Sequence, residues 1–120
     1  MKNTKTTLIY LSLIVGLIVF SCKDRDPPVA EITVVDKNSN PVAGAKVMLY
    51  CSTGSNKDCD NAGGTGKKYS VQTSDASGKT IHEFVLPAVL KIKATKDSLL
   101  GEDYVKLVEH ETVQKTVTIQ

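Results

Sequence analysis

The chain has 120 residues, with 15 Lys and Arg against 13 Asp and Glu and 41% hydrophobic residues. At this length one compact domain is the natural expectation, and 23% charged residues beside an ordinary apolar content argue against intrinsic disorder. Aromatic residues make up 5% of the chain and none is Trp, which argues against a stacking platform for single-stranded nucleic acid. We therefore expect a small globular domain that binds no nucleic acid.

Residues 1–21 are typical of an export signal. Lys2 and Lys5 precede an uncharged apolar segment, 8–20, of thirteen residues, whereas a membrane-spanning helix needs roughly 20. The segment ends in Val-Phe-Ser-Cys at 19–22, which resembles the lipobox of bacterial lipoproteins. The resemblance implies cleavage before Cys22 and attachment to the membrane through acyl chains on that cysteine. An uncleaved membrane anchor, or cleavage elsewhere, is the alternative.

Processing would remove the apparent basicity of the chain. Lys2 and Lys5 leave with residues 1–21 and no acid does, so 13 basic and 13 acidic side chains remain. A basic surface for nucleic acid or anionic lipid is therefore not indicated. Residues 22–28 (CKDRDPP) form a charged tether stiffened by two prolines, and they resemble export tags of surface lipoproteins in some Gram-negative lineages. We expect a lipid-anchored protein of the outer membrane, facing the periplasm or the exterior.

Residues 29–120 are expected to form one all-β domain. Seven short segments have period-two or β-branched character and are separated by turn residues. This number of strands in one small domain predicts a two-sheet antiparallel β-sandwich of the Ig-like kind. The expected strands are 29–36, 46–51, 68–73, 79–86, 89–96, 104–109 and 112–119, with 97–103 as a connection. The expected core includes Ile32, Val34, Val47, Leu49, Val71, Ile92, Leu107 and Val117.

Two motifs stand out in this domain. One is 34–36 (VVD), a polar turn and then 41–49 (PVAGAKVML); the other is 73–79 (TSDASGK), followed by Phe84 and Leu86-Pro87. They resemble motifs of carboxypeptidase-regulatory-like, or prealbumin-like, sandwich domains. The resemblance covers about 29–119 and implies the sandwich fold. It does not carry over the purine-pathway hydrolase activity of some members, because their C-terminal Tyr-Arg-Gly-Ser is replaced by TVTIQ. Nor does it imply the isopeptide crosslink of related pilins, since the first strand lacks Lys and the last lacks Asn.

Cys51 and Cys59 remain once Cys22 is lipidated. In an exported chain a disulfide is the default state for such a pair, and this one would close a nine-residue loop. Two free thiols, or a metal or redox role, are the alternatives, although two cysteines alone cannot complete a zinc site. We expect no metal and no cofactor.

The polar, Gly-rich segment 52–67 is the candidate binding loop. Its oxygen-bearing side chains could ligate Ca²⁺, but their order does not match an EF-hand, and a solvated loop has the same composition. The candidate binding residues are Asn56, Asp58, Asp60 and Asn61.

The two histidines, His82 in a strand and His110 near a hairpin, are expected to be exposed. A Ser-His-acid set could be drawn from Ser70 or Ser77, but nothing in the sequence aligns one. The sequence therefore predicts a non-enzymatic, lipid-anchored envelope module for adhesion or for binding a protein or glycan. The alternative is an accessory subunit of an outer-membrane receptor, transport or surface assembly.

Overall fold

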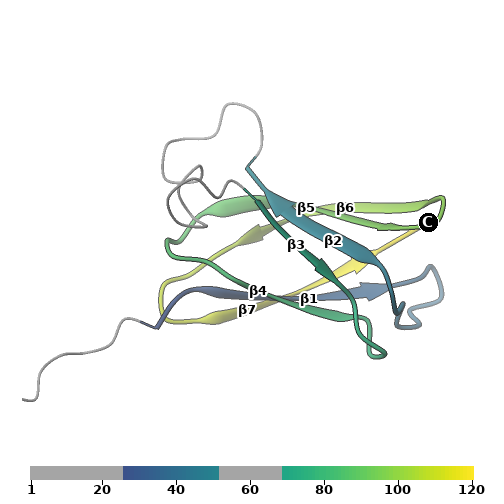
Figure 1. Cartoon of the computed structure of the whole chain (residues 1–120), viewed down its shortest axis with the longest axis horizontal. Coiled ribbons are helices and arrows are strands. Elements are labelled where there is room, and N and C mark those ends of the chain that lie inside the picture. The colour runs from purple at the N-terminus through teal and green to yellow at the C-terminus, as the bar shows by residue number, and fades with distance from the viewer. Residues whose placement is uncertain (1–25, 52–68) are drawn as a thin grey trace, which may run out of the picture.

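The computed structural model describes residues 26–51 and 69–120 of the chain (Figure 1). Within these ranges no helix is long and apolar enough to cross a membrane. The predicted signal segment 1–21 and the lipidation site Cys22 lie outside the described residues, so both stay predictions. The strands are β1 (Val29–Val35), β2 (Lys46–Tyr50), β3 (Tyr69–Thr73), β4 (Lys79–Glu83), β5 (Val89–Lys96), β6 (Leu99–Lys106) and β7 (Thr112–Thr118).

The strands form two layers that face each other across one core (Figure 1). One sheet has the order β4-β1-β7 and the other has the order β3-β2-β5-β6. Within each strand hydrophobic side chains recur at every second position, which gives the sheet one buried face and one outward face. The predicted all-β sandwich is confirmed, with one pair, β1 with β7, running parallel rather than antiparallel.

The core is built by every second side chain of the central strands. In β1, Ala30, Ile32 and Val34 are fully buried, and their neighbours point outward, as the period of two in a strand requires. In β5, every second side chain from Leu90 to Ala94 is buried in the same way. The other fully or almost fully buried hydrophobic residues are Ala45, Val47, Leu49, Phe84, Leu90, Ile92, Ala94, Val105, Leu107, Val117 and Ile119.

Val71 was expected in the core, and this prediction is wrong. The side chain is 38% exposed, because Val71 pairs with Met48 on the outward side of β2, while Ser70 pairs with the buried Leu49. A β-branched residue on an edge strand therefore lies on the outer surface of the sheet.

β6 begins at Leu99, five residues before the predicted start. Asp97 takes a positive φ of 52° in the short turn that joins β5 to β6, so 99–103 is strand rather than connection. Gly101 lies where β6 crosses the end of β7, and a Cβ there would collide with the carbonyl oxygen of Thr118. The glycine marks a close approach of two backbones, as glycine in a strand often does, and not a break in the strand.

β4 ends at Glu83, three residues before the predicted end. The amide of Phe84 donates to the carbonyl oxygen of Pro28, 3.0 Å away, outside the sheet ladder. Phe84 still fills the core, whereas Leu86, which precedes a proline, is 39% exposed. Pro87 has no amide N–H to donate to a sheet ladder, so this segment does not continue the strand.

Candidate functional site

Most of the candidate site residues predicted from the sequence lie outside the ranges that the structure describes. Cys59 and the candidate loop residues Asn56, Asp58, Asp60 and Asn61 lie outside the described residues. Cys51 directly follows β2 and packs partly buried against the core. The Cys51–Cys59 disulfide and the role of the loop therefore stay predictions. In the two described ranges, no three His, Cys, Asp or Glu side chains are grouped closely enough to hold a metal ion.

His82 was expected to be exposed, and this prediction is wrong: its side chain is fully buried between the sheets. The Nδ1 atom lies 2.9 Å from the Oγ of Ser70, and Nε2 lies 2.9 Å from the Oγ1 of Thr80. Both ring nitrogens are thus satisfied by hydroxyl groups, as a buried polar side chain requires. His110 lies exposed in the turn between β6 and β7, in agreement with the prediction.

The Ser70–His82 pair resembles part of a hydrolytic triad but lacks the chemistry of one. In a triad, a carboxylate orients the histidine and stabilises its protonated form; here the second ring nitrogen contacts the Thr80 hydroxyl. Burial lowers the pKa of His82 to about 4, so the ring is neutral at pH 7 and is a weak base. Ser77 lies apart, in the turn that Asp75 holds. We interpret the pair as a structural contact between the sheets.

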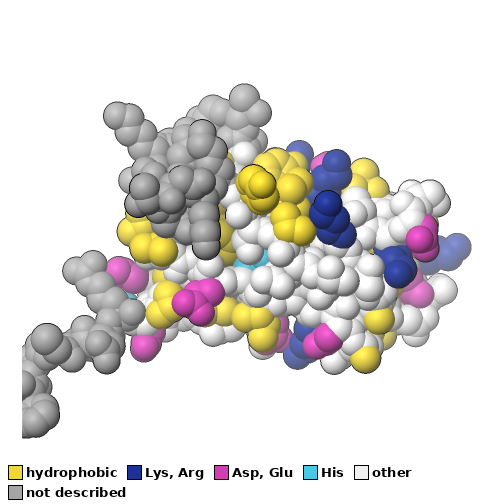
Figure 2. Space-filling model, viewed as in Figure 1, with side chains coloured by type: hydrophobic (Ala, Val, Ile, Leu, Met, Phe, Trp, Pro, Cys, Tyr) yellow, Lys and Arg dark blue, Asp and Glu magenta, His cyan; other side chains and the backbone are white. Residues whose placement is uncertain are grey.

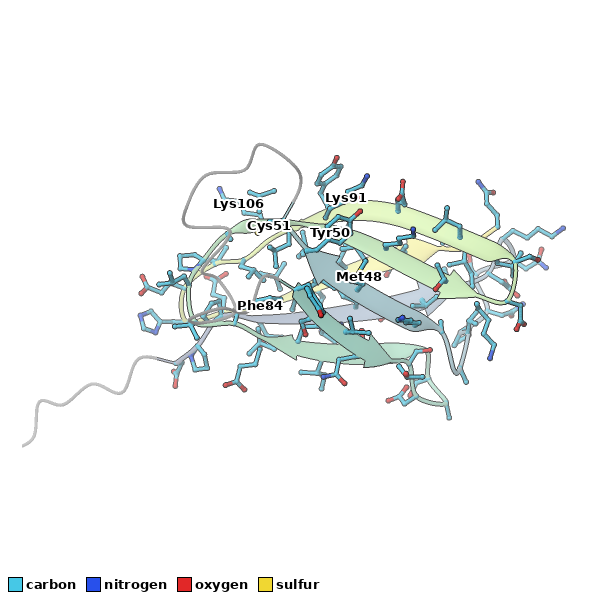
Figure 3. All side chains as sticks on the ribbon, turned by 45° about the horizontal axis from the view of Figure 1, so that its top comes forward. Met48, Tyr50, Cys51, Phe84, Lys91 and Lys106 are labelled. Carbon is cyan, nitrogen blue, oxygen red and sulfur yellow. The ribbon has the colours of Figure 1, made fainter. Side chains whose placement is uncertain are left out.

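A second cluster lies on the outer face of the four-stranded sheet. The strand register places Tyr69 opposite Tyr50, Tyr50 opposite Lys91, and Lys91 opposite Tyr104. One row across all four strands therefore contains every tyrosine of the described ranges. Tyr69 is 64% exposed and Tyr104 is 54% exposed. We call the outward-facing side chains of β3, β2, β5 and β6 the tyrosine face; Figure 3 shows Tyr50 and Lys91 side by side on it.

Next to this row, the tyrosine face is hollowed. Val71, Met48, Lys93 and Glu102 form the neighbouring row. A shallow pocket of about 240 Å³ is lined by Lys46, Met48, Lys93 and Thr95. Its lining thus combines the apolar Met48 side chain with two lysines.

The tyrosine face is electropositive. Lys91 lies 3.7 Å from Glu102, and attraction by this carboxylate, with a contribution from Tyr50, raises the pKa of Lys91. Among the described residues, Lys46 and Lys93 form no ion pair. The charged side chains that the register places on this face are Lys46, Lys91, Lys93, Lys106 and Glu102. Figure 2 shows basic and hydrophobic side chains together over this sheet.

The outer face of the other sheet is different. Its charged side chains are Lys79, Glu31 and Glu83, according to the pairing of β1 with β4, and Lys79 is bound to Glu31 at 2.9 Å. It carries no tyrosine. The two outer faces of one small sandwich thus differ in aromatic content and in the sign of their charge.

The sequence contained part of the signal for the tyrosine face. The alternation in 46–51 already separates Tyr50 and Met48 from the core residues Val47 and Leu49. The sequence does not show the strand order β3-β2-β5-β6, and this order brings tyrosines from three segments into one row.

Comparison with known proteins supports the fold. No protein-family profile and no curated protein matches the chain. Among solved structures it is similar to BcpA, the major pilin subunit of Bacillus cereus, with 19% identity and a TM-score of 0.56 over 79% of this chain and 30% of the pilin. A variant of this pilin has 17% identity and a TM-score of 0.52, again over 79% of this chain and 30% of the pilin. Chlorocatechol 1,2-dioxygenase from Pseudomonas putida has 12% identity and a TM-score of 0.51, over 84% of this chain and 63% of the dioxygenase.

These likenesses show a shared β-sandwich fold, of the kind found in pilin subunits, and the chain spans less than a third of the pilin's length. At such low identities, a shared fold says nothing about activity, which has to be inferred from the residues of the site.

Proposed function

We propose that this protein is a lipid-anchored, non-enzymatic β-sandwich module of the cell envelope that binds its partner through the tyrosine face. The observation that carries the proposal is the Tyr69–Tyr50–Lys91–Tyr104 row. Tyrosine is enriched at binding surfaces because it offers a large, rigid, amphipathic contact area. The row concentrates this residue type on one face, with two of its rings more than half exposed.

The anchor is the lipobox cysteine. Cys22 precedes the first strand by only seven residues, 22–28, and a fully extended chain of that length spans at most about 25 Å. Acylation of Cys22 would therefore hold the sandwich close to the outer-membrane surface. The motifs at 34–49 and 73–87 support membership of the carboxypeptidase-regulatory-like family as part of the same proposal.

A binding role fits better than a catalytic one. Within the described ranges, the one serine–histidine contact has a hydroxyl group where a triad has its carboxylate. A pilin subunit, which is a structural protein by its name, is among the similar folds. The dioxygenase is also similar in fold, at 12% identity, so the fold by itself does not distinguish the two roles. The composition of the site supports the binding role.

Site-specific photocrosslinking in living cells tests the proposal. The full chain carries p-benzoylphenylalanine either at Tyr104, on the tyrosine face, or at Ile81, an equally exposed position on the other sheet. The proposal predicts defined crosslinked products from position 104 and none from position 81. Products from position 81 alone, or from neither position, would contradict it.

A further inference from the structure

We propose that the ligand of the tyrosine face is an acidic, carboxylate-bearing polysaccharide. Its sugar rings would stack on the tyrosine row, and its carboxylates would pair with Lys46 and Lys93 at the neighbouring pocket. The inference rests on the proposed binding function and specifies the chemical class of the ligand.

The row has the length that a stacking platform for a short linear polymer needs. Neighbouring strands lie ~4.8 Å apart, so three spacings from Tyr69 on β3 to Tyr104 on β6 give about 14 Å. A pyranose ring has an apolar C–H face and a rim of hydroxyl groups. Tyrosine matches both, because its ring is apolar and its hydroxyl group donates and accepts hydrogen bonds. The row offers such contacts along the length of a short oligosaccharide.

The charge of the face selects an acidic polymer over a neutral one. Glu102 already interacts with Lys91 at 3.7 Å. Lys93 lies opposite Met48 on β5, Lys46 lies two residues before Met48 on β2, and both line the pocket. Neither lysine forms an ion pair with a described carboxylate, and Glu102, opposite Lys93 in the register, is bound to Lys91. The pocket, of about 240 Å³, is smaller than the ~300–1,000 Å³ of a drug-sized ligand site. It suits one substituent of a chain that passes along the row, and the two ammonium groups make a carboxylate the fitting one.

A protein partner fits the face less well. Lysine is depleted in the cores of protein interfaces, yet Lys91 and Lys93 stand on β5, at the centre of the tyrosine face. Peptides that add a strand bind a sheet edge through main-chain hydrogen bonds, whereas the row crosses the flat face between the edges. The other outer face, with Lys79 held by Glu31 and with Glu83 beside them, is the natural internal control.

The test is an affinity measurement on the full-length chain purified in detergent. The probes are oligogalacturonate, oligomannuronate and hyaluronan fragments, with methyl-esterified oligogalacturonate as the neutral counterpart of the first. The proposal predicts that at least one acidic probe binds, and that esterification of the carboxylates weakens binding about tenfold, the loss of a good charge-assisted contact. Binding should also weaken as the ionic strength rises, because salt screens exposed charges.

Two variants locate the site. Tyr104→Ala and Lys93→Gln should each weaken binding of the acidic probe by about five- to tenfold. Their matched controls, Ile81→Ala and Lys79→Gln, remove an exposed apolar side chain and a lysine from the other sheet, and should change it less than about twofold. Circular dichroism establishes that all four variants keep the fold, which is expected because none of the four side chains is buried.

Three results would overturn the inference: no binding of any acidic probe, equal affinity for acid and ester, or equal losses in the variants and their controls. If these occur while position 104 still crosslinks to a protein in cells, the ligand class is wrong and the proposed binding function stands. If position 104 does not crosslink either, both are wrong.

Discussion

Ser70 and His82 join the two sheets of the sandwich, with Ser70 Oγ 2.9 Å from His82 Nδ1. Ser70 belongs to β3, an edge strand of one sheet, and His82 to β4, an edge strand of the other. The opposite side is closed by Asp103 and Lys115, 3.3 Å apart, and by paired backbone hydrogen bonds between Leu100 and Gln120. In the part of the chain that the structure describes, the histidine contact thus joins the sheets along one side of the core, and the contacts between β6 and β7 join them along the other.

Stability should fall in acid through His82. Burial lowers its pKa in the folded chain to about 4, whereas an unfolded chain has the ordinary value near 6.5. As the pH falls below about 6.5 the unfolded state takes up the proton first, so the free energy of unfolding decreases until about pH 4. The loss amounts to about 3 kcal/mol for this group. Urea unfolding at a series of pH values measures it.

The control for this prediction is His82→Gln, which keeps a polar side chain but does not titrate. The difference in unfolding free energy between the wild-type protein and this variant should shrink by about 3 kcal/mol between pH 7 and pH 4. Titrating carboxylates affect both proteins and cancel. A difference that is independent of pH would show that His82 is not buried in its neutral form.

Gly101→Ala should destabilise the fold by about 2–3 kcal/mol, because the added methyl group meets the carbonyl oxygen of Thr118 where β6 and β7 cross. Glu102→Ala, one residue away and exposed, should change stability by less than about 1 kcal/mol, the range of an exposed ion pair. Chemical denaturation compares the two. Equal effects would mean that the backbones of β6 and β7 are not in contact.

The features that depend on residues close together in the chain were predicted from the sequence, and those that depend on distant residues were not. β5 was predicted with its observed bounds because Leu90, Ile92 and Ala94 alternate with exposed positions. The predicted start of β6 at 104 was wrong, and the role of Gly101 within this strand depends on Thr118, which is distant in sequence. His82 was placed at the surface because its partner Ser70 comes from another sheet. The tyrosine row depends in the same way on non-local strand order, which one sequence does not contain.

Replacing both Cys51 and Cys59 with Ser should lower the stability of the exported protein by about 1–3 kcal/mol, since the disulfide would close a short loop. The fold should survive, because the core draws on residues such as Ile32, Leu49 and Ile92, which are fully buried and take no part in the crosslink. Intact-mass measurement under alkylating conditions tests the bond itself. Two alkylated thiols without prior reduction would show that the pair is not bonded.

Cys22→Ala should abolish acylation and leave the signal uncleaved by the lipoprotein peptidase. Metabolic labelling with a fatty acid followed by immunoprecipitation measures the incorporation. The wild-type protein should carry the label and the variant should carry none. Label on the variant would refute the lipobox interpretation and favour another mode of membrane attachment.

The most direct test of the tyrosine face is to map amide chemical shifts of the full chain while an acidic oligosaccharide is added. The account predicts that the perturbed amides cluster on β2, β3, β5 and β6, around Tyr50, Lys91 and Lys93, and that β1, β4 and β7 are unaffected. Perturbations that centre on the outer face of the β4-β1-β7 sheet would contradict it.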